Sequence, residues 1–280
     1  MRKIDVRTIK DAISKLSIDA NVNLRADVRR AMEKALKKEK KNTARETLRV
    51  FLENADIAKR ERRALCQDTG LVSVYMEIGQ GVRLTGGDVK EAIEEGVREG
   101  YEKGFLRKSV VKSPILRENT GQNTPPVIYT ELVKGDKVKI TVVPKGFGSE
   151  NKSKIAMLKP TDGEEKIISF VLDTVKSAGP DACPPYILGI GLGGTFDKAA
   201  HLAKKALIFP VDRPNPKRHL RKLEESILRK VNALGIGPMG LGGKTTCLGV
   251  NILEYPTHIA GLPVAVNLGC HITRSAGKII

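Results

Sequence analysis

The sequence contains no tryptophan, and aromatic residues make up only 4% of its 280 positions. The core must therefore be built mainly from Ile, Leu, Val and Ala, and a surface that stacks nucleic-acid bases on aromatic rings is disfavoured. No apolar run approaches the roughly 18 residues that a membrane span needs, and no charged-then-apolar leader opens the chain. We therefore expect a cytoplasmic protein without a membrane partner.

Cysteine is also scarce, with four residues in the whole chain and no C-x-x-C pair among them. This spacing argues against a zinc knuckle and against a thioredoxin-type redox pair. Disulfides are disfavoured in a cytoplasmic protein as well. The cysteines are therefore either buried small side chains or ligands of a cofactor that joins distant parts of the chain.

Positive charge is in excess, since 49 Lys and Arg residues against 32 Asp and Glu give a net charge of +17. Much of it lies in early helical stretches such as Lys37 to Lys41, with few aromatic residues between the cations. We interpret this as a solvated, lysine-rich surface. The alternative, a basic nucleic-acid-binding module, would require an affinity for DNA that falls steeply with salt.

Hydrophobic periodicity predicts an α+β (mixed α/β) protein, in which a helical N-terminal region is followed by small mixed β-sheets flanked by helices. We expect one domain over 1–280 with a helical portion over about 1–62. Helices are predicted near 6–16, 28–36, 43–59, 88–103, 163–178, 195–206 and 217–234, and strands near 71–78, 127–133, 137–143, 186–190, 247–253 and 264–268. The strands 127–133 and 137–143 are joined by Lys134-Gly135-Asp136, which predicts a hairpin.

Glycines 189, 191 and 194 fit the G-x-G-x-x-G pattern between a strand and a helix, and Asp212 lies near the distance expected of a ribose-binding carboxylate. A nucleotide-binding enzyme using Gly189 to Gly194 is therefore one alternative. Against it, the glycines at 235, 237 and 240 match the same pattern, and no second half of a doubly wound fold is visible. Binding of NAD(H) or ATP would distinguish this alternative.

Polar residues of four kinds are consecutive at Cys66, Gln67, Asp68 and Thr69, just before a predicted strand. Chemistry is often carried by loops on a rigid scaffold. Cys183 and Cys247 are likewise surrounded by Gly, Pro or Thr at predicted loop ends, where a backbone can wrap a cofactor. Cys270 instead follows an apolar run, which is typical of a small buried hydrophobic residue.

Two further loops carry candidate ligand-binding groups. The segment 113–126 is rich in turn-forming residues, and Arg117 is its clearest anion ligand. The segment 145–151 is a polar loop in which glycines such as Gly146 would let backbone N–H groups approach a ligand. Simpler interpretations exist, since Asp68 could cap a turn and Arg117 could form a surface ion pair.

Five motifs together resemble class I (iron–sulfur) fumarate hydratase and the related tartrate dehydratase, in the family's order and over nearly the whole chain. They are Cys66-Gln67-Asp68-Thr69-Gly70, Arg117-Glu118-Asn119-Thr120-Gly121, Lys145-Gly146-Phe147-Gly148-Ser149-Glu150-Asn151, Ala182-Cys183-Pro184-Pro185 and the segment from Gly235 to Gly249.

The resemblance implies that Cys66, Cys183 and Cys247 hold a [4Fe–4S] cluster whose fourth iron is open as a Lewis acid. Gln67 and Asp68 would act as catalytic residues that hold the substrate or the departing hydroxide. Arg117 would bind a substrate carboxylate. Gly146 would supply backbone donors, although Phe147 interrupts a row of glycines common in longer members.

The resemblance also implies an oxygen-sensitive hydro-lyase of the tricarboxylic acid cycle that hydrates fumarate reversibly to (S)-malate, with conversion of tartrate to oxaloacetate as the alternative. The sequence stops where single-chain members continue into a domain that carries the general base. We therefore expect an α subunit that needs a separate β subunit, in an α2β2 heterotetramer with an α–α contact and a dicarboxylate substrate. The four histidines are scattered, and none is assigned a role.

Overall fold

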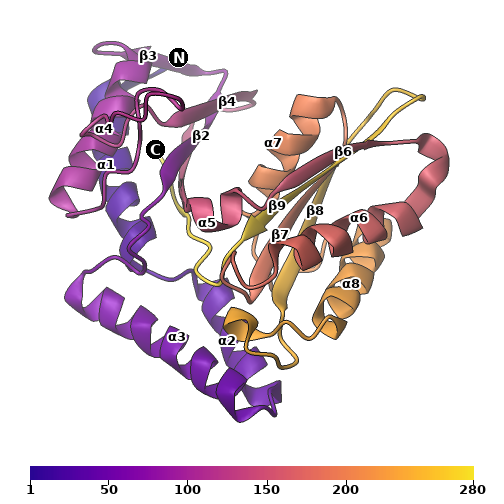
Figure 1. Ribbon diagram of the computed structural model, residues 1–280. Helices are drawn as coiled ribbons and strands as arrows, with labels where there is room; N and C mark the ends of the chain where they lie inside the picture. The colour runs from indigo at the N-terminus through magenta and orange to yellow at the C-terminus, as the bar shows by residue number, and fades with distance from the viewer. The chain divides into compact units, whose positions relative to one another are not determined.

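The computed structural model describes all 280 residues, which fold into two compact units assembled from separated stretches of the chain (Figure 1). Unit 1 comprises Met1–Arg25, Ala55–Phe147 and Arg274–Ile280, and unit 2 comprises Ala26–Asn54 and Gly148–Thr273. Helix α3 (Asn42–Glu61) begins in unit 2 and ends in unit 1. Both units combine helices with mixed β-sheets, so the predicted α+β class is confirmed.

Unit 1 is built on a four-stranded sheet of order β10-β5-β2-β4, with a separate parallel pair of β1 and β3. Apolar residues of helices α1 and α4 pack with the sheet residues to form its core. The two helices approach closely at Gly96, where a Cβ atom would lie 2.6 Å from a main-chain oxygen of α1. The elements are β1 (Arg2–Asp5), α1 (Val6–Val22), β2 (Leu71–Gly79), β3 (Val82–Thr85), α4 (Val89–Lys103), β4 (Val127–Val133), β5 (Val138–Lys145) and β10 (Ala276–Ile279).

The predicted hairpin between β4 and β5 is wrong, because β2 lies between these strands, parallel to β4 and antiparallel to β5. The turn after β2 takes up the hydrogen bonds that a hairpin would have used. The Gln80 N–H donates to Val133 O at 2.9 Å, and the Gly81 N–H donates to Gly135 O at 2.8 Å. The chain does reverse direction at Lys134-Gly135-Asp136, but the two strands that this segment connects are separated in the sheet by β2.

Unit 2 is built on a sheet of order β6-β9-β7-β8, with α6 and α8 packed on one face and α7 on the other (Figure 1). Strand β7 runs parallel to β8 and antiparallel to β9. The elements are α2 (Ala26–Lys38), α5 (Phe147–Glu150), β6 (Lys154–Leu158), η1 (Pro160–Asp162), α6 (Gly163–Ala178), β7 (Tyr186–Gly193), α7 (Phe196–Ala206), α8 (Arg218–Ala233), η2 (Pro238–Gly240), β8 (Cys247–Tyr255) and β9 (Leu262–Gly269).

Residues alternate across β7, so that Leu188, Ile190 and Leu192 enter the core with α6 and α8 while the glycines between them face α7. A Cβ atom at Gly189 would lie 2.1 Å from the main-chain oxygen of Ala203, and one at Gly191 would lie 2.0 Å from that of Ala199. The glycines of the nucleotide-like motif therefore let a helix lie directly on the strand. They are strand residues and do not form a phosphate-binding turn.

The predicted helices and strands are confirmed, β4 and β5 included, with longer bounds at β7, β8 and β9. Four short or edge strands, β1, β3, β6 and β10, were not predicted. The segment 145–151 was predicted as a loop, but Phe147–Glu150 forms the short helix α5. None of the helices has the length and apolar character required to cross a bilayer.

Candidate active site

The loop 64–70 connects α3 to β2 in unit 1 and is fixed by close packing against the end of β5. Gly70 has φ +81°, a conformation that residues with a side chain rarely adopt, and a Cβ atom there would lie 2.7 Å from the backbone of Lys145. The main-chain N–H of Leu65 donates to Asn21 O of α1 at 2.8 Å. The polar residues 66–68 are therefore presented by a loop whose two ends are held.

The carboxylate of Asp68 is half-buried and accepts two backbone hydrogen bonds. Its Oδ1 accepts from the Gly70 N–H at 2.9 Å, and its Oδ2 accepts from the Phe147 N–H at 2.8 Å. The first contact is the turn cap that the simpler interpretation expects, whereas the second joins the loop to the 145–151 segment. A Cβ atom on Gly146 would lie 3.0 Å from Asp68 Oδ2, so glycine allows the backbone to approach this carboxylate closely.

Arg274 lies beneath this loop and was not singled out from the sequence. Its side chain is only 4% exposed, and Nη2 donates to Asp68 O at 2.8 Å while Nη1 donates to Asn21 Oδ1 at 3.0 Å. A buried guanidinium with two defined acceptors brings a permanent positive charge close to Asp68. Nothing in the pattern Thr273-Arg274-Ser275 distinguishes it from a surface arginine, so only the fold reveals it.

Two more buried side chains hold the strand side of the loop. The Tyr101 hydroxyl donates to Thr69 O at 2.6 Å, and Asn123 Nδ2 donates to Gly70 O at 3.1 Å. Burial raises the pKa of Tyr101 above its ordinary value, which keeps the hydroxyl protonated as a donor. The loop is therefore pinned from α1, α4 and the 107–126 segment together.

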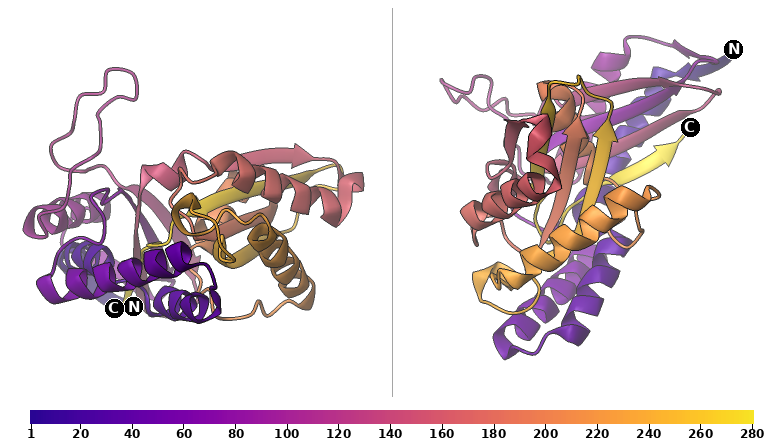
Figure 2. Two further views of the ribbon diagram at one scale, coloured as in Figure 1. Left: turned by 60° about the horizontal axis from the view of Figure 1, so that its bottom comes forward. Right: turned by 90° about the vertical axis from the view of Figure 1, so that its right-hand side faces the viewer.

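Gln67 and Arg117 lie at the surface of unit 1. The Gln67 side chain is exposed, and its Oε1 accepts from Cys66 Sγ at 3.2 Å. Arg117 is exposed within the long loop 107–126, which projects in the left view of Figure 2. Its backbone has φ +61°, and its N–H donates to Ser113 O at 3.0 Å. The structure therefore groups Asp68 with Gly146 and Arg274, and leaves Arg117 on a separate projecting loop.

In unit 2, three cysteines lie at the same end of the sheet, where β7 and β8 begin and β9 ends. Cys183 precedes β7, Cys247 pairs with Tyr186 at the start of β7, and Cys270 follows Gly269, which pairs with Ile187. Burial, and then the nearby Cys183, Asp181 and Cys247, raise the pKa of Tyr186. None of the cysteines forms a disulfide.

The exposure of two of these cysteines is the reverse of what the sequence predicts. Cys270 is only half-buried, whereas Cys247 is 2% exposed as the first residue of β8. Burial raises the pKa of the Cys247 thiol to about 12, and its Sγ donates to Gly249 O at 3.2 Å. Cys247 is buried because strand β8 begins at this residue, where it pairs with Tyr186 of β7.

No three His, Cys, Asp or Glu side chains are gathered closely enough to hold a single metal ion. An iron–sulfur cluster has a different requirement, because each cysteine binds a separate iron and the thiolates do not surround one ion. Unit 2 fits this requirement in its donor chemistry, since it presents half-buried thiols that form no disulfide, Cys183 and Cys270, at one end of the sheet. Cys66 is also half-buried and forms no disulfide, on the loop of unit 1 described above.

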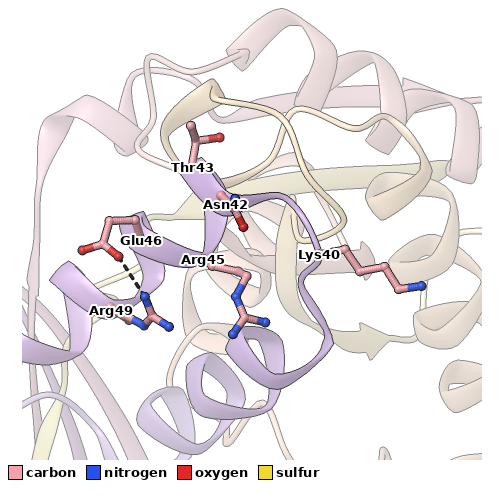
Figure 3. Close-up of a pocket in the computed structure, with 6 residues that line it drawn as sticks. All are labelled: Lys40, Asn42, Thr43, Arg45, Glu46 and Arg49. Atoms are coloured by element: carbon pink, nitrogen blue, oxygen red, sulfur yellow. Dashed lines mark hydrogen bonds and ion pairs between the residues drawn. The ribbon is translucent and has the colours of Figure 1, made fainter.

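A cavity of about 680 Å³ lies at the start of α3 and is lined by Lys40, Asn42, Thr43, Arg45, Glu46 and Arg49. Its cations do not converge on one point (Figure 3), since Arg49 is paired with Glu46 at 3.0 Å and Arg45 donates to Glu39 O at 3.1 Å. The cavity therefore offers no focused anion site, and the chemistry of the candidate site remains with the Asp68 loop and the cysteines.

Comparison with known proteins gives a consistent result. The family model described as fumarate hydratase (fumerase) matches residues 10–278. A provisionally named L(+)-tartrate dehydratase subunit alpha of Methanocaldococcus jannaschii is 41% identical over 278 residues, covering 97% of this chain and 97% of that protein. A provisionally named class I fumarate hydratase of Geobacillus stearothermophilus is 32% identical over 96% of this chain and 56% of that protein. The L(+)-tartrate dehydratase subunit alpha of Escherichia coli O157:H7 is 31% identical over 78% of this chain and 73% of that protein.

Proposed function

The chain belongs to the class I fumarate hydratase family of hydro-lyases, and from that premise we propose that it is the α subunit of an enzyme that hydrates fumarate reversibly to (S)-malate. The observation that carries the proposal is the family match over residues 10–278, which contains every candidate site residue. The fixed loop around Asp68 supports it, because a dehydration site needs polar groups held in place beside the leaving hydroxide.

In this proposal the residues of unit 1 bind and orient the dicarboxylate. Asp68 and Gln67 hold the substrate or the departing hydroxide, and the Gly70 and Phe147 N–H groups keep the Asp68 carboxylate in one orientation. Gly146, whose missing Cβ lets its backbone lie close to that carboxylate, is proposed to supply a backbone donor to the substrate. Arg117 is proposed to pair with a substrate carboxylate, which its exposed guanidinium can do through a bidentate contact.

We propose Cys66 and Cys183 as two ligands of a [4Fe–4S] cluster, which when bound supplies a Lewis acid for the hydroxyl and carboxylate of the substrate. The third ligand is Cys247 in the sequence prediction. The half-buried Cys270 is the better candidate on geometry, since it lies with the half-buried Cys183 at the same end of the sheet, whereas Cys247 is only 2% exposed. The two alternatives are separated by single substitutions.

We propose that the general base comes from a separate β subunit and that two α subunits associate in an α2β2 assembly located in the cytoplasm. Support comes from the relatives named as alpha subunits, one of which matches this chain over 97% of both lengths. The positive charge of the chain is proposed to reflect its solvated surface, without a nucleic-acid partner.

The dehydration of tartrate to oxaloacetate is the second candidate, because two of the relatives above are named as tartrate dehydratase subunits. In the dehydration direction, malate and tartrate each lose water, as a hydroxyl group and a proton, from a four-carbon dicarboxylate. Malate and tartrate differ in one hydroxyl group, and a site that hydrogen-bonds that group discriminates strongly against the substrate without it.

The test is co-expression with the chain encoded beside it, anaerobic cluster reconstitution, and parallel assays of fumarate hydration and tartrate dehydration. We expect fumarate hydration that requires both chains and is lost in air. Activity on tartrate alone would make tartrate, and not fumarate, the substrate. Activity on neither compound would refute the proposal.

Reconstituted single variants of the isolated chain test the ligand set. Cys66→Ser and Cys183→Ser are each expected to abolish the broad visible absorbance of the cluster. Cys270→Ser is expected to abolish it as well, whereas Cys247→Ser retains it. The reverse pattern for the last two variants would restore Cys247 as the third ligand.

A further inference from the structure

Phe51 of helix α3 and His271 form a stacked ring pair within unit 2. Their ring centroids lie 3.7 Å apart, the planes are inclined by 12°, and both side chains are half-buried. Such stacking is favourable beyond the area it buries and fixes the plane of the imidazole. His271 therefore has a defined orientation although it lies outside any helix or strand.

His271 places two donors on one acceptor, the carbonyl oxygen of Cys183. The main-chain N–H of His271 lies 3.3 Å from that oxygen, and Nδ1 lies 3.1 Å from it. A carbonyl oxygen can only accept, so Nδ1 carries the hydrogen and donates it. The imidazole therefore adds a second, directional bond to the main-chain contact.

Cys183 needs such support because its backbone is unusual. Its φ of +54° lies in the left-handed region, which residues with a Cβ atom rarely occupy and which needs support from the surrounding structure. The turn is also held from its other side, since the Cys183 N–H donates to Pro180 O at 3.0 Å. The direction of the Cys183 thiol depends on this backbone conformation.

The same histidine belongs to the turn that carries Cys270. Cys270 O accepts from the Thr273 N–H at 3.0 Å and from Thr273 Oγ1 at 2.8 Å, which closes a tight turn around His271. One imidazole thus links the Cys270 turn to the Cys183 turn.

We propose that His271, oriented by Phe51, is a positioning residue that holds the Cys183 and Cys270 thiols in a fixed relation. The role in cluster binding rests on the proposed function, whereas the positioning of the thiols does not. Without the imidazole bond, the Cys183 turn is expected to relax from its left-handed conformation and the thiol to become more mobile.

The experiment measures alkylation of each cysteine by iodoacetamide in the full-length, cluster-free chain, resolved by peptide mass spectrometry. Three variants separate the contacts. His271→Phe keeps a ring for the stack but removes the donor, and Phe51→Leu removes the stack. His271→Asn is the matched rescue, because its side-chain amide donates from nearly the position of Nδ1.

We expect His271→Phe to accelerate alkylation of Cys183 by about three- to tenfold, the range of one ordinary hydrogen bond. Phe51→Leu should give a smaller increase, and His271→Asn should return the rate close to that of the parent chain. Cys66 and Cys247 are internal controls whose rates should not change. An unchanged or slower Cys183 rate in His271→Phe, or equal acceleration at all four cysteines, would overturn the proposal.

A second measurement on the reconstituted chain separates the two proposals. The rate at which iron is lost in air should rise in His271→Phe and recover in His271→Asn. If the parent chain assembles no cluster, the proposed function fails while the alkylation result still decides the role of His271. If His271→Phe does not fold, Phe51→Leu supplies the same comparison, and a Cys183 rate equal to that of the parent chain then overturns the proposal.

Discussion

Arg274 offers the most direct test of how the Asp68 loop is held. Replacing it with methionine removes two hydrogen bonds from a charged donor, to Asp68 O and Asn21 Oδ1, while retaining most of the side-chain volume. Bonds from charged donors contribute about 1.5–3 kcal/mol each, and part of this is offset because a buried guanidinium no longer needs to be desolvated. We expect a net loss of about 2–3 kcal/mol in the local stability of the loop.

Hydrogen exchange is the suitable assay, since a chain of two units need not unfold in one step. The Gly70 amide is bonded to Asp68 Oδ1 and the Leu65 amide to Asn21 O, so both report on the loop. A loss of about 2–3 kcal/mol accelerates their exchange by about 30- to 150-fold. Arg274→Lys keeps the positive charge, but its single ammonium group cannot reach both acceptors. Its exchange rates should therefore lie between those of the parent chain and of Arg274→Met.

Arg7→Met serves as the matched control, because the Arg7 side chain is 80% exposed and its ion-pair partner is Asp5 in the same unit. It should leave the exchange of Gly70 and Leu65 unchanged. Exchange of both amides within about threefold of the parent in Arg274→Met would show that the loop is held without the guanidinium, and would refute the reasoning.

Three further predictions concern other parts of the chain. Gly191→Ala should destabilise unit 2 by about 3 kcal/mol or more, because its Cβ would lie 2.0 Å from Ala199 O, whereas Gly148→Ala, whose nearest atom would be 3.8 Å away, should be nearly neutral by thermal melting. Asp68→Ala should speed exchange at both Gly70 and Phe147, whereas Asp68→Asn should spare one of the two amides; equal protection in all three chains would contradict this. The raised pKa of Cys247, about 12, favours the protonated thiol in the folded chain, so its contribution to stability is full below about pH 9 and declines as the pH rises toward 12. Urea unfolding should therefore show a smaller decline over this range in Cys247→Ser, and an identical decline would count against the burial of the thiol.

Helical periodicity was sufficient to find the long helices, because their buried faces repeat over several turns, as at Ile9, Ile13 and Leu16 of α1. Strand pairing was not accessible in the same way. The runs that form β4 and β5 are adjacent in sequence and alternate correctly, but insertion of β2 between them depends on contacts from sixty residues earlier. The sequence of β4 and β5 alone does not specify such a long-range contact.

The candidate site shows the same division. The density of polar groups at Cys66 to Thr69 marked the loop, since four such residues in succession are unusual. The residues that hold it, Arg274, Asn21 and Tyr101, are dispersed along the chain, and each resembles an ordinary surface or core residue in its own segment. The exposures of Cys247 and Cys270 were also misjudged, because they depend on where β8 starts and β9 ends.

The closing segment of the chain has a consequence for synthesis on the ribosome. Strand β10 pairs with β5, and Arg274 supports the loop of a unit whose other strands were all translated more than a hundred residues earlier. Because β8 and β9 of unit 2 precede Arg274 in the chain, the sheet of unit 2 can be completed before the earlier-made sheet of unit 1, which waits for residues 274–280. A chain truncated after Thr273 is therefore expected to retain the sheet of unit 2, while β5 of unit 1 lacks its β10 partner and the Asp68 loop lacks its arginine.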